Sequence, residues 1–487
     1  MTDILFTLFS LQNLFVMCVG MAGGIIIGAL PGLNSTMGVA IMLPLTFGME
    51  SVTGMLMLLA VYCGSIYGGS ITAILINTPG TPSSAATVLD GYPMARSGRA
   101  RDALNIALTV STLGGLASCL ALIFIAPMMA SVAMKFGPAE YFSLSVFGLT
   151  IISSVSGRHL SKGLMMAAAG LLLTVVGIDP IEGTTRMTFG SFNLMSGIPL
   201  IPALLGVFAV SEILVKTKEI HQPAQNAISL RTAQIKTRDI LSHWLLILKS
   251  SLMGIFIGVV PGTGAALASF LSYNIAKRSS KTPEQFGKGA IEGLISVETA
   301  NNAVTGATLI PLLTLGIPGD TVTAILVGAL TMQGVIPGPQ LFTNDRFWIN
   351  SIMTGLVFVN LLMWLQGKVF IKFFSQVTRI PNVLLIPMLV SLCVVGVFAA
   401  NNASFDIYLM LIFGFCGYWL IRFDFPLPPL VIAMVLGPLA EQNMRKALLI
   451  SDGDPSIFFT RMISCAFLVI SFAVMAIAVY KTFRRAK

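Results

Sequence analysis

The chain carries the stretch Gly24-Ile25-Ile26-Ile27-Gly28-Ala29-Leu30-Pro31-Gly32, and this stretch returns as Gly254-Ile255-Phe256-Ile257-Gly258-Val259-Val260-Pro261-Gly262. The glycines and the Pro-Gly pair keep the same spacing in both copies. A second Pro-Gly pair follows in each half, within Asn77-Thr78-Pro79-Gly80-Thr81 and within Gly316-Ile317-Pro318-Gly319-Asp320. The sequence therefore consists of two related halves.

Each Pro-Gly pair lies within or beside an apolar run. Proline removes a backbone donor, and glycine permits dihedral angles that end a helix. In hydrocarbon, irregular chain is tolerated only where protein buries it or where it borders a polar cavity. We therefore expect broken helices at membrane depth, and such breaks at matching places in two halves are typical of a transporter's binding site. The expected helix breaks and hinges are Gly24, Gly28, Pro31, Gly32, Pro79, Gly258, Pro261, Gly262 and Pro318.

The composition is that of an integral membrane protein. Of the 487 residues, 55% are hydrophobic and 10% are charged, and the mean hydropathy is +0.88, whereas a soluble domain has about 25% charged residues. Apolar runs near the roughly 20 residues that span a bilayer as a helix cover 5–30, 55–76, 106–133, 349–367 and 458–480. The net charge of +9 comes from Lys and Arg in short loops, which indicates membrane orientation rather than nucleic-acid binding.

Basic loops are placed differently in the two halves. After the first Pro-Gly site, 276–288 holds four Lys or Arg residues, whereas the corresponding 45–54 holds none. After the second site the bias reverses, because 91–103 holds three arginines and 332–347 holds one. Short loops rich in Lys and Arg stay cytoplasmic, so corresponding loops are expected on opposite sides of the membrane. The same rule predicts a periplasmic N-terminus and a cytoplasmic C-terminus, with Arg445 as an exception on the outer side.

These patterns predict an all-α polytopic membrane protein. We expect two inverted-topology repeats, with broken helices or re-entrant hairpins at the Pro-Gly sites. The first repeat covers 1–217, a cytoplasmic linker covers 218–240, and the second repeat covers 241–487.

Polar residues follow each Pro-Gly pair and predict a binding site. Ser, Thr, Asn and Asp before an apolar run are N-cap residues, so each site is expected to begin a half-helix whose positive end faces the membrane interior. Such helix ends bind anions without a buried cation. An interfacial loop or Gly-x-x-x-Gly packing explains any one site taken alone, but the recurrence of both sites favours binding. The residues expected around the solute are Asn34, Ser35, Thr36, Asn77, Thr78, Gly80, Thr81, Ser83, Ser84, Thr263, Gly264, Gly319 and Thr321.

Four further residues are expected to serve a coupling ion: Glu298, Asn301, Asn302 and Asp320. A carboxylate within a membrane segment is by default a functional candidate, and it suits a cation because it repels an anionic solute. The small and polar segment 62–70 fits close helix packing better than a solute path. We expect no metal site and no cofactor, and because no ATP-binding Gly-x-x-x-x-Gly-Lys-Ser/Thr loop occurs, we expect an ion gradient to drive transport.

The motifs resemble a known family. Asn77-Thr78-Pro79-Gly80-Thr81-Pro82, together with Glu298-Thr299-Ala300-Asn301-Asn302 and the following Pro318-Gly319, is similar to the large transmembrane permease subunit of the tripartite tricarboxylate transporters. The resemblance implies a multi-pass permease of the bacterial inner membrane that works with a small four-helix membrane subunit and a periplasmic solute-binding protein. It also implies elevator-like, secondary active symport of carboxylates such as citrate, driven by sodium or protons.

Two other classes stay open at this point. The Pro-Gly repeats do not exclude a passive anion channel. A membrane-embedded enzyme is disfavoured, because no nucleophile, base and orienting group occur together. The sequence leaves open which carboxylate is carried, which ion is coupled, the oligomeric state and the number of membrane crossings.

Overall fold

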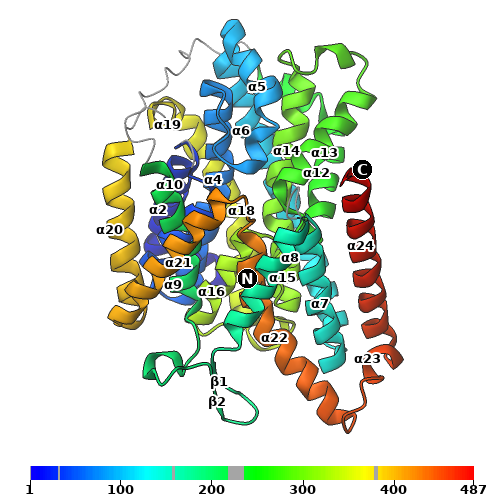
Figure 1. The fold of residues 1–487 in the computed structure, drawn as a ribbon. Coiled ribbons are helices and arrows are strands. Elements are labelled where there is room, and N and C mark those ends of the chain that lie inside the picture. Colours follow the sequence, from blue (N-terminus) through cyan, green and yellow to red (C-terminus); the bar gives the residue numbers. More distant parts are fainter. Residues whose placement is uncertain (1, 31–32, 156–159, 218–234, 378–381, 487) are drawn as a thin grey trace.

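The computed structural model describes residues 2–30, 33–155, 160–217, 235–377 and 382–486 (Figure 1). In this part of the chain the protein is an all-helical membrane protein with one short antiparallel hairpin. Six of the described helices are long and apolar enough to cross a membrane: Leu11–Gly28, Ser51–Ile76, Val88–Ala133, Arg346–Val369, Ser404–Arg422 and Met462–Tyr480. Five of them coincide with apolar runs of the sequence. Ser404–Arg422 does not, and it carries Asp406 in its first turn and Arg422 in its last.

The first half contains helices, short 3-10 or π turns and the hairpin. The helices are α1 (Thr2–Leu8), α2 (Leu11–Gly28), α3 (Ser35–Met42), α4 (Ser51–Ile76), α5 (Val88–Met94), α6 (Ala100–Ala133), α7 (Pro138–Val155), α8 (Leu160–Thr174), α9 (Leu200–Leu204) and α10 (Ser211–Lys216). The turns are η1 (Leu43–Thr46), η2 (Pro82–Ala85), η3 (Ala95–Arg99), η4 (Phe192–Leu194) and η5 (Leu205–Val210). In the hairpin, β1 (Gly177–Ile178) pairs with β2 (Thr185–Arg186).

The second half is also made of long and short helices. It contains α11 (Thr237–Leu241), α12 (Trp244–Val259), α13 (Gly264–Ser279), η7 (Pro283–Gln285), α14 (Ile291–Ala307), α15 (Leu309–Leu315), α16 (Thr321–Met332), α17 (Leu341–Asn344) and α18 (Arg346–Val369). It continues with α19 (Ile371–Val377), α20 (Asn382–Asn401), α21 (Ser404–Arg422), α22 (Pro428–Ile450), α23 (Ile457–Thr460) and α24 (Met462–Ala486). Most of the expected linker, 218–234, lies outside the described residues.

Glycines let the backbones of α2 and α4 approach each other. A Cβ atom on Gly24 would lie 2.5 Å from the carbonyl oxygen of Val61, and one on Gly28 would lie 2.2 Å from that of Ser65. Gly24 lies inside the continuous helix α2, which ends at Gly28. Gly258 is the second-last residue of α12 and packs against α14. Gly24 therefore does not break its helix and serves helix packing, whereas Gly28 and Gly258 lie at the ends of α2 and α12.

The helices α4 and α14 form the centre of the molecule. The residues of α4 that form its membrane-spanning part are all buried. The helices α2, α6, α12, α13 and α18 pack around α4 and α14. A second group consists of α7, α8, α22 and α24, and a third consists of α9, α10, α20 and α21. Figure 1 shows α20 and α24 at opposite outer edges of the molecule.

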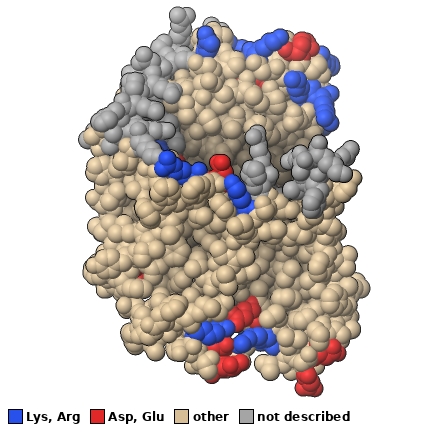
Figure 2. Space-filling view, in the orientation of Figure 1, with Lys and Arg blue, Asp and Glu red and all other residues tan. Residues whose placement is uncertain are grey.

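One end of the molecule gathers basic loops from both halves. The carboxylate of Asp90 in α5 accepts three backbone N–H groups from the loop before α14. These donors, at 2.9, 2.8 and 2.8 Å from Oδ1, are Gly287, Gly289 and Ala290. The loops that follow α5 and precede α14 therefore lie together, at the end of the molecule where Lys and Arg side chains collect in Figure 2.

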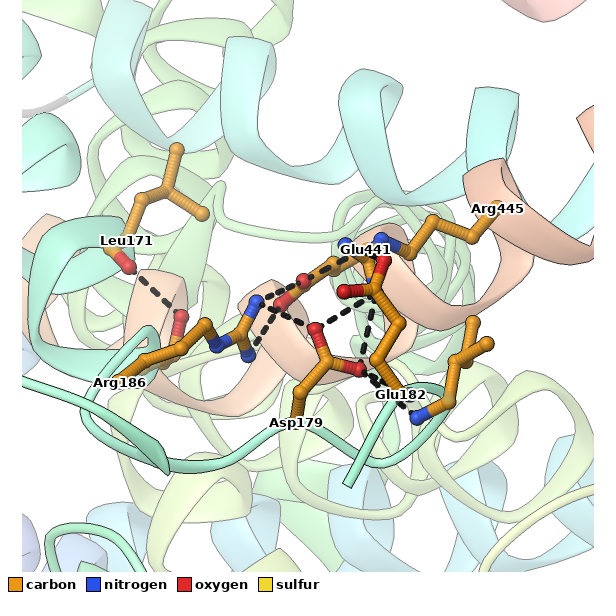
Figure 3. Close-up of polar contacts among 8 residues, drawn as sticks. Leu171, Asp179, Glu182, Arg186, Glu441 and Arg445 are labelled. Carbon is orange, nitrogen blue, oxygen red and sulfur yellow. Dashed lines mark hydrogen bonds and ion pairs between the residues drawn. The ribbon is translucent and has the colours of Figure 1, made fainter. Parts of the chain in front are cut away.

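The opposite end carries the hairpin and an ion-pair network with α22 (Figure 3). Arg186 Nη1 lies 2.6 Å from Glu441 Oε1 and 3.3 Å from Asp179 Oδ2, and Arg445 Nη1 lies 2.7 Å from Asp179 Oδ2. The backbone N–H of Glu182 and the guanidinium of Arg445 lower the pKa of Asp179 from 3.8 to about 2. Arg445, the exception in the charge pattern, is thus paired with carboxylates of the hairpin loop and of α22.

Candidate functional site

A cavity of about 550 Å³ lies where Pro-Gly segments of both halves meet. Three helices begin at its wall: α3 at Ser35, α13 at Gly264 and α16 at Thr321. The first turn of a helix has free N–H groups and a partial positive charge. This part of the wall therefore favours a bound anion.

Side-chain caps and one direct contact hold the helix ends in place. Asn34 caps α3, since its Oδ1 accepts a backbone N–H of the first turn at 2.8 Å. Asp320 caps α16, since its Oδ1 accepts both the N–H and the hydroxyl of Thr323 at 2.8 Å. The hydroxyl oxygens of Thr36 and Thr321 are 3.0 Å apart and join the two helices. Local capping thus positions polar groups from both halves beside one another.

Ser35 is one of the residues that line the cavity. The residue is only 5% exposed, and within the described residues its Oγ has no hydrogen-bond partner. A buried polar group without a partner costs about 1–3 kcal/mol. Its place in the cavity wall therefore favours a ligand that exchanges a hydrogen bond with it.

Much of the remaining wall comes from η5, from α10 and from the ends of α21 and α22 with the connection between them: Val207, Phe208, Ser211, Glu212, Ile421, Asp424, Phe425, Pro426, Leu427 and Pro428. The helix α4 and the segment at η2 also line the cavity, with Tyr62, Ile66, Thr81, Pro82 and Ser83. The described residues that line the cavity include no Lys or Arg. A cation lies nearby, since Lys162 Nζ donates to the Phe423 carbonyl oxygen at 2.7 Å and stands 5.2 Å from the ring centre of Phe425.

A second polar cluster surrounds Glu298 on α14. This residue is fully buried, and its Oε2 accepts hydroxyl hydrogen bonds from Ser70 at 2.8 Å and from Ser111 at 3.1 Å. The Thr87 hydroxyl donates to Oε1. The described ion pairs do not include Glu298. Because a buried charged carboxylate is costly without a counter-charge, the cluster suits a bound cation or a proton.

Two asparagines flank Glu298 on the same helix. Asn302 Nδ2 donates to the hydroxyl of Ser111 at 2.8 Å and to the Glu298 carbonyl oxygen at 3.1 Å. Both amide atoms of Asn301 are buried and have no hydrogen-bond partner within the described residues. Amide and hydroxyl oxygens are ligands that hard cations accept.

The tripartite tricarboxylate transporter TctA family matches the chain over residues 14–432. The chain belongs to this family. It is 39% identical over 466 residues, 96% of this chain and 93% of the relative, to the uncharacterized 52.8 kDa protein in the TAR-I ttuC' 3' region of Agrobacterium vitis. It is also 39% identical over 231 residues, 47% of this chain and 96% of the relative, to the uncharacterized protein in the TAR-II ttuC' 3' region of the same organism. No solved structure matches.

As a TctA-family protein the molecule is a transporter and not an enzyme. The structure brings part of the expected solute site together at the cavity: Asn34, Ser35, Thr36, Thr81, Ser83, Gly264 and Thr321, with Asp320 from the expected ion site. It places Asn77, Thr78, Gly80, Ser84, Thr263 and Gly319 away from the cavity wall. Pro31 and Gly32 lie outside the described residues.

Local geometry explains why several expected residues of this transporter do not line the cavity. Asn77 has a φ of 59° and ends α4 in the left-handed conformation. The segment after it forms only the four-residue η2 instead of a half-helix. Thr263 donates its hydroxyl to the carbonyl oxygens of Ile257 and Val260, so it does not cap α13. Pro79, Pro261 and Pro318 do lie between helices.

Several polar residues of the two sites were not predicted from the sequence, among them Tyr62, Ser70, Thr87 and Ser111. Tyr62 and Ser70 are the first and last residues of the small and polar segment 62–70. The composition of this segment indicated a functional role, but we assigned it to close helix packing. Ser111 gave none, because it is a single hydroxyl within an apolar run.

Proposed function

We propose that this TctA-family protein is the large permease subunit of a binding-protein-dependent secondary transporter that imports tricarboxylates or related organic anions. The observation that carries this proposal is the meeting of the first turns of α3, α13 and α16 at one cavity. Backbone N–H groups and hydroxyls bind the carboxylates of the solute there without a buried cationic side chain. A volume of about 550 Å³ also falls in the usual range of small-molecule sites.

The coupling ion is sodium or a proton in this proposal. Asp320 borders the same cavity as the anion site, and Tyr62 donates a hydrogen bond to its Oδ2 at 2.8 Å. Like charges repel strongly in a site of low dielectric constant. A cation or proton at Asp320, at Glu298, or at both therefore favours entry of the anion, with Asn301 and Asn302 as further ligands. The electrostatics of the site thereby support symport.

The finer features of the proposal follow from charge placement and from the family. The basic loops after α5 and before α14 lie at one end of the molecule, which supports an inverted repeat with that end in the cytoplasm. We assign the protein to the bacterial inner membrane, with a periplasmic N-terminus and a cytoplasmic C-terminus. Its partners are a small four-helix membrane subunit and a periplasmic solute-binding protein, and its movement is elevator-like.

Reconstituted uptake tests this function. Proteoliposomes contain the chain with its proposed small subunit and binding protein, and labelled tri-, di- and monocarboxylates are supplied with sodium and proton gradients imposed separately. The variant Thr321→Ala removes a cavity hydroxyl, and Thr331→Ala on the same helix is the matched control outside this cavity. We expect uptake that needs one gradient and the binding protein, with a reduction of about tenfold in Thr321→Ala and none in Thr331→Ala.

Other outcomes point to the competing class. Flux down the solute gradient with no coupling ion and no binding protein identifies a passive anion channel and overturns symport. Equal uptake by Thr321→Ala and the wild-type protein shows that the solute does not pass through this cavity.

A further inference from the structure

Tyr62 lies between the cavity and the buried cluster around Glu298. It is 1% exposed, yet its side chain borders the cavity. Its hydroxyl donates to Asp320 Oδ2 at 2.8 Å and lies 3.4 Å from the hydroxyl oxygen of Thr308, the residue that directly follows α14. One phenol group therefore contacts both the cavity carboxylate and the central helix.

From Thr308, hydrogen bonds continue along α14 toward Glu298. The hydroxyl of Thr308 donates to the Thr305 carbonyl oxygen at 3.1 Å, and the hydroxyl of Thr305 donates to the Asn302 carbonyl oxygen at 2.7 Å. Asn302 in turn donates to Ser111, which donates to the Glu298 carboxylate. Buried hydroxyls, backbone carbonyls of α14 and the Asn302 amide therefore follow one another from Asp320 to Glu298, with the covalent backbone of α14 joining the hydrogen-bonded steps.

The geometry of α4 and α14 shows that this line joins two separate sites. Tyr62 reaches Thr308 and Ser70 reaches Glu298, so the two helices run in opposite directions beside each other. Tyr62 and Ser70 are eight residues apart on α4, a rise of about 12 Å in an α-helix. Glu298 does not border the cavity. Solute in the cavity therefore does not contact Glu298 directly.

We propose that Tyr62 couples occupancy of the cavity to the ion-binding state of Glu298, an inference that rests on the function proposed above. The phenol has a single proton, and the negative Asp320 holds it in the present arrangement. A cation at Asp320 releases this proton toward the oxygen of Thr308, whose own hydroxyl already donates to the Thr305 carbonyl oxygen. The phenol thus has two discrete hydrogen-bond arrangements, one on Asp320 and one on the residue that follows α14, and such an element carries free-energy coupling between two sites.

Three variants separate coupling from folding and from solute binding. Tyr62→Phe keeps the ring and removes both contacts. Thr308→Val breaks the same line at a residue outside the cavity. Tyr67→Phe is the matched control, because Tyr67 is on the same helix and equally buried, and its hydroxyl has no hydrogen-bond partner within the described residues. Thermal unfolding of each purified chain shows whether it is folded.

The measurement is equilibrium binding of labelled citrate, and of each carboxylate from the uptake panel, to the purified full-length chain. The Kd is determined with and without saturating sodium, and across pH at fixed sodium, to give the factor by which each ion tightens binding. Linkage requires the solute to tighten ion binding by the same factor. We expect a wild-type factor of about 10 or more and a reduction of at least about fivefold in Tyr62→Phe and Thr308→Val. Tyr67→Phe keeps the wild-type factor.

The outcomes distinguish this inference from the proposed function. Wild-type protein that binds no carboxylate of the panel, or binds it with no effect of either ion, overturns both. Wild-type protein that shows coupling, together with folded Tyr62→Phe and Thr308→Val variants that keep the full coupling factor, overturns the role of Tyr62 alone. A Thr308→Val variant that weakens solute binding equally with and without ion also contradicts it, since that result indicates a change of the cavity instead of the coupling.

Discussion

Ser35→Ala is the sharpest test of the cavity, because the change removes one oxygen atom and no internal hydrogen bond of the described chain. Ser35 is at the first position of α3 in the cavity wall and is 5% exposed. A buried polar group without a partner destabilises the protein, so we expect the free energy of unfolding to stay the same or to rise slightly in the variant.

The effect on solute binding is expected to be large by comparison. A hydrogen bond between a neutral hydroxyl and a charged carboxylate contributes about 1.5–3 kcal/mol, which corresponds to about a 10- to 150-fold change in Kd. We expect the low end of this range, because water enters the space of the missing oxygen and binds the solute in its place. The assay is equilibrium binding of the labelled carboxylate, with thermal unfolding measured on the same samples.

Ser145→Ala provides the matched control. Ser145 is equally buried, but it is on α7 and its hydroxyl donates to the Tyr141 carbonyl oxygen at 2.8 Å. We expect this variant to lose some stability and to keep the wild-type Kd. An unchanged Kd in Ser35→Ala, or equal losses of affinity in both variants, refutes the assignment of Ser35 to the solute.

Three further predictions concern stability in detergent, measured by thermal unfolding. Asp90→Ala leaves three backbone donors without their acceptor and lowers the free energy of unfolding by about 1–3 kcal/mol, whereas Asp90→Asn keeps one acceptor oxygen and lowers it less. Equal losses of stability in the two variants contradict the role of Asp90 as the acceptor of these three N–H groups. Gly28→Ala places a methyl group 2.2 Å from a backbone oxygen and costs about 1–3 kcal/mol, while Gly23→Ala on the same helix meets only the end of a methionine side chain and is tolerated. The pKa of Asp179 falls from 3.8 to about 2 on folding, so its contribution to stability is complete above about pH 4 and disappears toward pH 2. The difference in Tm between wild type and Asp179→Asn should follow that window, and a difference independent of pH contradicts the ion-pair network.

Local features of the site could be predicted from the sequence because capping acts over three residues. Asn34 and Asp320 each follow a helix break and precede an apolar run, and both cap the next helix. Gly24, which lies within the continuous helix α2, shows the limit of this reasoning. Two glycines that are four residues apart permit either a helix break or close helix packing. Which of the two occurs depends on the partner helix, which lies elsewhere in the sequence.

The cluster around Glu298 could not be assembled from the sequence for the same reason. Its donors Ser70, Thr87 and Ser111 lie 228, 211 and 187 residues away along the chain. Each is one hydroxyl within or beside an apolar run, a position that also fits a side chain bonded to its own helix backbone. The sequence could identify Glu298 as costly to bury, but only the packing of α4, α5 and α6 against α14 shows what surrounds it.

The carboxylates that line the cavity are also brought together from distant parts of the sequence, and they bear on how the cavity binds an anion. Glu212 in α10 and Asp424 in the connection between α21 and α22 lie far from the Pro-Gly pairs in the sequence, and the fold brings them to the same cavity as Asp320. Three helix N-termini attract an anion to this cavity, while these carboxylates oppose it. Because the two effects act at short range on the same solute, a small cation or a proton bound in the cavity shifts the balance from exclusion to binding. Ion dependence is therefore expected from the electrostatics of the wall itself, and neutralising Asp320 should weaken the dependence of solute affinity on the ion.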